Sequence, residues 1–406
     1  MGIRKISVVL FLVGVAMPWV SAQVTIQQLL DAVSDDYISE NGNTYQNTIR
    51  TFPQRWHWLD KFDIRTETDR MQTSRQEFLV RTSFHSIKRK KHELAKFKST
   101  FERKMAELAS ERYELLYDSY QKIVEIIELQ SLQTIRNQQY LLYKKVDSLY
   151  GVSLSAGEKI DLADFIKTKE KLFALEKEIL EDKLSLQNQI KGFELLKADS
   201  VLTDILVTAA EMKARIEKGA LDMASHPEVR SLDLKSQVLQ SELEIEKSKN
   251  NKILDFTQLR YSVREDLLLE NRFSVSAGFT IPWRGSSSYR YQDILYKQAE
   301  AILDSDMKKA EINENITKKT QQFQHNYQLY TLSSQEDMSG QWKDTKSKII
   351  NSGRLDVKDI ILMQQYELDQ KSRTLEYYHQ LLHVYIDILY YNGGLSSTES
   401  ILYSQK

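Results

Sequence analysis

Few side chains in this 406-residue chain have the types and spacing that catalysis or metal binding requires. His379 and His383 are four residues apart, which places two imidazoles on one face of a helix, as in zinc hydrolases. The pair lacks the glutamate that such an enzyme uses as its base, so ordinary packing or surface positions are the better interpretation. No phosphate-binding loop, Gly-x-Ser-x-Gly elbow or dinucleotide fingerprint occurs. We therefore expect no enzyme, no cofactor and no bound metal.

The composition excludes further classes of protein. The chain has 56 basic and 57 acidic residues, whereas a nucleic-acid-binding protein would show a basic excess. It has no cysteine, which excludes disulfides, thiol catalysis and a lipid-modified N-terminal cysteine. It also has only 13 glycines and 4 prolines, where average usage would give about 28 and 20. Few turn-forming residues predict few turns and long secondary-structure elements.

The N-terminus has the pattern of a secretory signal peptide. Arg4 and Lys5 precede a run of 15 mostly apolar residues, Ile6–Val20, and Val20-Ser21-Ala22 offers small residues for cleavage. A membrane anchor is the weaker interpretation, because a spanning helix needs about 20 apolar residues. We therefore expect residues 1–22 to be removed on export.

Most of the remaining chain has the pattern of long helices. Residues 54–150 contain neither glycine nor proline, and His85–Leu149 is rich in Lys, Glu, Leu and Gln, which favour helix. A return helix is predicted over Asp161–Lys197. In the last long helix, Leu368, Leu375, Leu382 and Leu389 recur every seven residues, as in a coiled-coil seam.

Two segments instead alternate apolar and polar residues, which is typical of strands with one apolar and one wet face. The first segment covers Trp56–Asp69 and Phe78–Phe84, and the second covers Thr257–Val263 and Phe273–Ile281. The same residues recur at one offset of 195: Phe78 and Phe273, Val80 and Val275, Phe84 and Phe279, Asp161 and Asp356, Asp164 and Asp359. A single offset over about 100 residues indicates an internal duplication.

The predicted fold is mainly α with a small β part: long coiled-coil helical hairpins and four amphipathic strands per chain. The expected segments are a signal peptide (1–22), an N-terminal helical segment (23–55), β-hairpin 1 (56–84), long helical hairpin 1 (85–198), a connector (199–225), a helix (226–252), β-hairpin 2 (253–283), long helical hairpin 2 (284–392) and a C-terminal tail (393–406). Tight turns are expected at Tyr150–Ser153 and Asn351–Arg354, because glycine often ends a helix.

Four strands cannot close a membrane barrel, since closed barrels begin at eight strands. Copies would have to pool strands, so that a dimer gives eight and a trimer twelve. The charged wet face suits a hydrated lumen, which wider barrels provide. A soluble β-sandwich capped by helices is the alternative. The residues expected to face lipid are Phe62, Ile64, Phe78, Val80, Phe84, Leu259, Tyr261, Phe273, Val275, Phe279 and Ile281. The expected interfacial aromatics are Trp56, Trp58 and Trp283.

This layout resembles the TolC family of outer-membrane efflux and secretion channels over essentially the whole mature chain. The most specific part is Lys348–Gln365, which is similar to the family's glycine turn and the helix start that follows it. His226–Arg230, followed by a polar helix, is similar to the stretch before the family's second hairpin. The resemblance implies a homotrimer with a twelve-strand barrel in the outer membrane of a Gram-negative cell and a helical tunnel across the periplasm.

The resemblance also implies a function and site residues. The chain would be the outer-membrane component of a tripartite efflux or type I secretion system, a passive conduit that docks on a periplasmic adaptor protein and an inner-membrane pump. Gly151, Gly353 and Arg354 would lie at the docking tips. Asp359 matches an acidic residue that constricts the entrance in family members, and Asp164 is its counterpart in the first repeat, but Leu362 replaces the family's second acidic residue. A periplasmic coiled-coil scaffold without a pore is the alternative function.

Overall fold

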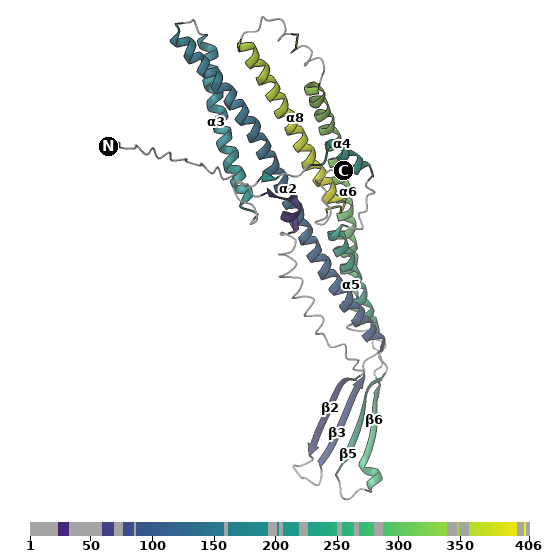
Figure 1. The fold of residues 1–406 in the computed structure, drawn as a ribbon. Helices are drawn as coiled ribbons and strands as arrows, with labels where there is room; N and C mark the ends of the chain where they lie inside the picture. Colours follow the sequence, from purple (N-terminus) through teal and green to yellow (C-terminus); the bar gives the residue numbers. More distant parts are fainter. Residues whose placement is uncertain are drawn as a thin grey trace, which may run out of the picture.

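The computed structural model shows an elongated molecule with a β-sheet at one end and long helices extending from it (Figure 1). The structure describes residues 23–31, 59–68, 76–84, 87–157, 161–193, 201–202, 206–218, 226–249, 254–263, 268–279, 287–338, 347–348, 357–395 and 402. The expected signal peptide, residues 1–22, lies outside the described residues.

The sheet consists of two hairpins side by side. Its strands are β2 (Leu59–Thr68), β3 (Gln76–Phe84), β5 (Leu254–Ser262) and β6 (Phe273–Phe279), in the order β2-β3-β5-β6, with antiparallel neighbours throughout. A short 3-10 helix, η4 (Leu269–Arg272), precedes β6. Ile64 pairs with Val80 in the first hairpin and Leu259 with Val275 in the second. Each residue of the first pair lies 195 positions before its counterpart in the second pair. The duplication seen in the sequence is therefore reproduced in the strand register.

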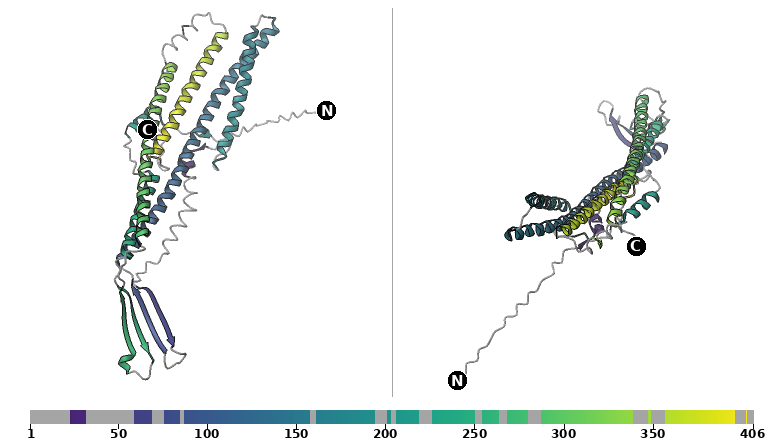
Figure 2. Two further views of the ribbon diagram at one scale, coloured as in Figure 1. Left: turned by 180° about the vertical axis from the view of Figure 1, so that it is seen from behind. Right: turned by 90° about the horizontal axis from the view of Figure 1, so that it is seen from above.

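Four long helices form the body of the molecule. α2 (Ile87–Ser155) has 69 residues, which at 1.5 Å per residue is roughly 100 Å. α6 (Ser287–Met338) also begins near the sheet, and α3 (Leu162–Ile190) and α8 (Val357–Tyr391) lie in the half far from it (Figure 1). α5 (Pro227–Lys249) lies against α2 and α6 near the sheet. Seen from above, the helices form a curved layer in which α2 lies between α3 and α8, and α8 contacts α6 (Figure 2).

The largest hydrophobic core lies midway along this layer, where short segments pack against the long helices. β1 (Gln23–Val24) pairs in parallel with β4 (Val201–Leu202), and α4 (Ala209–Lys218) contacts α8. The backbone N–H of Val207 donates to the carbonyl of Leu402 at 2.7 Å, and the Tyr378 hydroxyl donates to the Val207 carbonyl at 2.7 Å. Fully buried members of the core are Leu30, Tyr120, Ile123, Val124, Met212, Leu381, Leu382 and Ile386.

One sequence-based prediction needs correction. The tight turn predicted at Tyr150–Ser153 is wrong, because α2 continues through Gly151 to Ser155. The chain turns instead at Gly157, whose φ of 76° is accessible to glycine without the clash that a Cβ would cause. In the expected N-terminal helical segment, Gln23 and Val24 form β1 and residues 26–31 are helical, and residues 32–55 lie outside the described residues. The other predicted turn, Asn351–Arg354, lies outside the described residues.

Candidate functional site

One face of the sheet is apolar and exposed. The strand register aligns Ile64, Val80, Leu259 and Val275 in a row across the middle of all four strands. The exposed fractions are 64% for Ile64, 45% for Leu259 and 78% for Val275. Phe62, Phe78, Phe273 and Phe279 are likewise exposed, while Val80 and Tyr261 are half-buried. In water this surface would be unfavourable, since large apolar patches normally mark a contact with protein or membrane.

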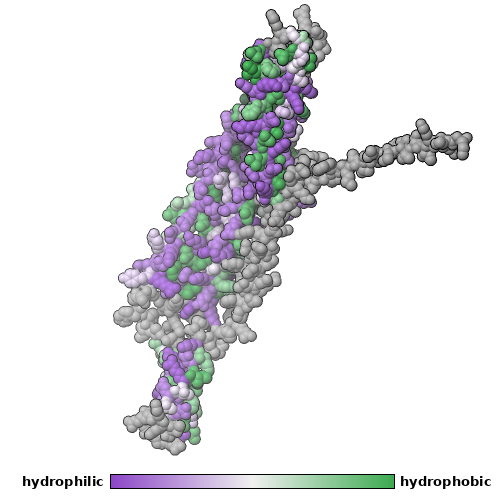
Figure 3. All heavy atoms as spheres, turned by 90° about the vertical axis from the view of Figure 1, so that its left-hand side faces the viewer, coloured by the Kyte–Doolittle hydropathy of each residue, from purple (hydrophilic) through white to green (hydrophobic). Residues whose placement is uncertain are grey.

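The opposite face is polar and charged. The Arg260 guanidinium and the Glu77 carboxylate are 2.7 Å apart, and Lys61 lies 3.1 Å from Asp63. Figure 3 views the sheet edge-on, with hydrophobic residues along one side and hydrophilic residues along the other. The alternation read from the sequence therefore gives a sheet with one apolar and one wet face.

An aromatic ring interrupts the polar face near its helical end. Phe256 lies opposite Gly278, where an added Cβ would come within 2.2 Å of the ring. The Arg81 guanidinium lies 3.6 Å from the centre of the same ring, a cation–π contact. Sequence reasoning missed this cluster, although a glycine inside a strand signals that another group approaches the backbone closely.

Both outer strands of the sheet have an unpaired side. β2 pairs only with β3 and β6 only with β5 among the described residues, so the outer side of each strand is unpaired. An unpaired edge exposes backbone N–H and C=O groups that can pair with another chain. The sheet therefore has the features of a fragment of a larger sheet.

Several predicted site residues cannot be located. Trp56, Trp58, Trp283, Ile281, Gly353 and Arg354 lie outside the described residues. For Phe84 and Asp359 the structure describes the backbone alone: Phe84 ends β3, and Asp359 is the third residue of α8.

The two predicted constriction residues occupy equivalent positions. Asp164 lies in the first turn of α3, whose preceding residue, Asp161, accepts hydrogen bonds from the backbone N–H groups of Ala163 (2.9 Å) and Asp164 (3.4 Å). Asp359 lies in the first turn of α8, and both turns are at the helical end farthest from the sheet (Figure 1). Within one chain, α2 separates α3 from α8, so two such residues could meet only near the axis of a larger ring.

A polar network joins α2 to α8 and α6. Asp387 accepts hydrogen bonds from Tyr117 at 2.7 Å and Gln121 at 2.8 Å, and Lys319 lies 2.7 Å from its other oxygen. One turn earlier on α8, His383 contacts the Gln121 side chain, and its Nε2 lies 3.6 Å from Glu128. The contact with His383 lowers the pKa of the Glu128 carboxyl, whereas burial raises it, and the net result is a lowered pKa.

His379 lies close to this network but makes no hydrogen bond to it among the described residues. It is 1% exposed, and neither of its ring nitrogens has a hydrogen-bond partner among the described residues. Burial lowers its pKa to about 4, so that the ring is neutral at physiological pH. Across the described residues, no three His, Cys, Asp or Glu side chains are grouped so that they could hold a metal ion. His379 is therefore a buried packing residue.

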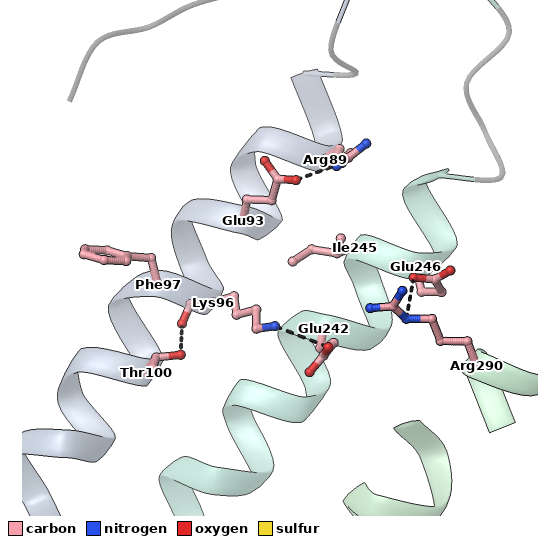
Figure 4. Close-up of a pocket in the computed structure, with 9 residues that line it drawn as sticks. All are labelled: Arg89, Glu93, Lys96, Phe97, Thr100, Glu242, Ile245, Glu246 and Arg290. Carbon is pink, nitrogen blue, oxygen red and sulfur yellow. Dashed lines mark hydrogen bonds and ion pairs between the residues drawn. The ribbon is translucent and has the colours of Figure 1, made fainter. Parts of the chain in front are cut away.

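A shallow cavity of about 390 Å³ lies between α2, α5 and α6 near the sheet (Figure 4). Each of three cations around it faces a carboxylate: Arg89 with Glu93 at 2.8 Å, Lys96 with Glu242 at 3.3 Å, and Arg290 with Glu246 at 3.6 Å. The cavity lining is therefore balanced in charge.

Among the described helices, none combines the length and the apolar character that crossing a membrane would need. No protein-family model matches the chain, and no curated protein matches it. Its fold, however, is that of solved outer-membrane channels. CusC, described as forming a transmembrane channel, is 11% identical, with a TM-score of 0.56 over 92% of this chain and 93% of that one.

Two other channels are similar to a comparable extent. The outer-membrane channel OprN is 12% identical, with a TM-score of 0.54 over 90% of both chains. The MtrE outer membrane channel of Neisseria gonorrhoeae, in its open state, is 9% identical, with a TM-score of 0.54 over 91% of this chain and 89% of that one. The resemblance to TolC-type channels is thus confirmed for the fold.

Proposed function

We propose that this chain is the outer-membrane channel component of a tripartite efflux or type I secretion system. The observation that carries the proposal is the four-stranded sheet, which exposes an apolar face, a charged face and two unpaired edges. In lipid, every backbone polar group must be paired, so such a sheet is stable only inside a closed barrel. The apolar face then meets hydrocarbon and the charged face meets water.

A closed β-barrel is best explained by three copies of the chain. Three sheets supply twelve strands, enough for a water-filled bore lined by residues such as Arg65, Arg81 and Arg260. Two copies would give eight strands, whose interior is filled by side chains, and burying the many charges of the polar face there would be costly. The shared fold with outer-membrane channels supports this assembly.

The long helices would continue the barrel as a tunnel through the periplasm. A helix of roughly 100 Å cannot be buried within one compact chain, and three curved layers side by side would form a tube. We infer that the tips beyond Gly151, Gly353 and Arg354 dock on a periplasmic adaptor protein and an inner-membrane pump. We expect the chain itself to perform no catalysis, and the pump to supply the energy.

At the tunnel entrance we place a ring of Asp359, joined by Asp164. Carboxylates gathered around a threefold axis repel one another and attract cations. Millimolar magnesium added on the helical side should then reduce the conductance of the wild-type channel. The Asp359→Asn variant should lose most of this block, while the control Asp306→Asn, an exposed aspartate on α6, should retain it. An equal block in both variants would contradict the proposed ring.

The function is tested by adding the purified protein from detergent to planar lipid bilayers. We expect stepwise ohmic conductance from a species that runs as a trimer in unheated gel samples. The control is the same protein denatured by boiling, which should give no steps. A chain that remains a dissolved monomer without detergent and never conducts would overturn the proposal and favour a periplasmic scaffold.

A further inference from the structure

The first part of α2 is strongly basic. Residues 89–104 contain seven basic and two acidic side chains, whereas the equivalent stretch of the second repeat, 284–299, contains three basic and one acidic. The first stretch lies at the start of α2, and the second includes the start of α6. The high positive charge of residues 89–104 is therefore not needed for the fold, because the equivalent stretch of the second repeat has fewer than half as many basic residues.

Most of these cations are neutralised within the chain. Arg89 and Lys96 pair with glutamates beside the cavity in Figure 4, Lys98 lies 3.8 Å from Glu102, and Arg103 and Lys104 lie 2.8 and 2.5 Å from Glu107. Two cations differ. Lys90 and Lys91 have no carboxylate partner among the residues that the structure describes, and Lys91 is exposed.

The position of these two lysines is unfavourable for the isolated helix. They lie three and four residues from its start, where the helix dipole repels positive charge, and α2 has no acidic residue in its first turn. An external anion at this level would remove the penalty. Since successive helix positions point about 100° apart, Lys90 and Lys91 can reach different groups.

The sheet defines what surrounds this turn. β3 has nine residues, which extend about 30 Å, or about 23 Å along the normal when tilted by about 40°. That height matches the apolar band of an outer-membrane barrel, about 25 Å. α2 begins three residues after β3 ends, so Lys90 and Lys91 would lie at the level of the lipid headgroups.

We propose that Lys90 and Lys91 bind the phosphate groups of anionic phospholipids in the leaflet that faces the helices. The inference rests on the proposed membrane channel and adds a specific lipid contact to one of its two repeats. Each lysine beside an anionic leaflet strengthens binding to that lipid surface by about fivefold. The pair should then give a preference of up to roughly thirtyfold for anionic over zwitterionic lipid.

The absence of natural cysteines allows a direct test. Ala95, exposed and one turn beyond Lys91, is changed to cysteine and labelled with bimane. The labelled protein is inserted into phosphatidylcholine vesicles that contain either nitroxide-labelled phosphatidylglycerol or nitroxide-labelled phosphatidylcholine at equal mole fraction. Quenching reports which lipid lies beside the helix.

We expect stronger quenching by phosphatidylglycerol, lost in 1 M salt and lost in the Lys90→Gln/Lys91→Gln variant. The control Lys171→Gln/Lys183→Gln removes two exposed charges from α3, far from the sheet, and should keep the preference. Equal quenching by both lipids in the unsubstituted protein, or an unchanged preference in the Lys90/Lys91 variant, would overturn the inference while leaving the channel intact. If neither lipid quenches and the protein stays in the supernatant, the proposed channel fails as well.

Discussion

Replacing Val275 by arginine tests which solvent meets the apolar face of the sheet. Val275 belongs to the row that crosses the middle of all four strands, and 78% of its surface is exposed. If that face meets hydrocarbon, the arginine lies near the bilayer midplane. There it should destabilise the folded protein by about 2–4 kcal/mol per chain, a factor of roughly 30 to 1,000 in the folding equilibrium.

Ser276→Arg is the matched control. Ser276 is the next residue along β6 and lies on the polar face, so the same side chain there should meet water. Its effect should stay within about 0.5 kcal/mol, as for most surface substitutions. Both variants add one positive charge to the same strand, which leaves the facing solvent as the main difference.

The free energy of unfolding is measured by equilibrium urea titration of the protein in lipid vesicles, followed by tryptophan fluorescence. The expected result is a lower midpoint for Val275→Arg and an unchanged midpoint for Ser276→Arg. Equal, small effects would mean that both faces meet water, and the membrane assignment would be wrong. A large effect of Ser276→Arg alone would mean that the two faces are assigned the wrong way round.

Three further predictions concern packing and charge. Gly278→Ala should destabilise the protein by about 1–3 kcal/mol, because its Cβ would lie 2.2 Å from the Phe256 ring. Adding Phe256→Ala should relieve this loss, and thermal denaturation of the single and double variants measures both effects. Asp387→Ala should cost about 1–3 kcal/mol in urea titrations, because it leaves Tyr117 and Gln121 without their acceptor and the half-buried Lys319 without its partner, whereas the exposed Glu314→Ala should change little. The pKa of His379, about 4, is below its unfolded value of about 6.5, so the unfolded state binds the proton first: stability is fully present above pH 6.5 and falls by at most about 3 kcal/mol towards pH 4. Urea midpoints between pH 4 and 7.5 measure this loss, and His379→Leu should flatten it; an equally steep profile in that variant would contradict the assignment.

Much of the fold could be predicted from the sequence because the elements are long and periodic. The alternation in both hairpins fixes which residues share a face, and the 195-residue repeat predicts that the pairs Ile64–Val80 and Leu259–Val275 are equivalent. The scarcity of glycine and proline predicts helices as long as α2. These patterns involve many residues, so that no single exception obscures them.

The parts that sequence reasoning missed depend on single residues or on distant contacts. Gly151 resembles a helix terminator, but α2 passes through it and ends near Gly157, whose positive φ could not be read from residue type. The position of Phe256 over Gly278 requires the register of β5 against β6, including an irregularity between Leu254 and Phe256. The contact of Tyr117 with Asp387 joins residues 270 positions apart, which no local pattern reveals.

The assembly at the centre of this account is tested most directly by crosslinking the two edges of the sheet. In one chain β2 and β6 are the opposite edges, so they can meet only between copies. Because the chain has no cysteine, one cysteine is introduced in β2, at Lys61, Asp63 or Arg65, and one in β6, at Ser274 or Ser276, and the membrane-inserted protein is oxidised. We predict that at least one pairing gives a covalent product of three chains and nothing larger on denaturing gels without reductant. Monomers alone, a product limited to two chains, or an open-ended ladder at every pairing would contradict a closed barrel of three copies.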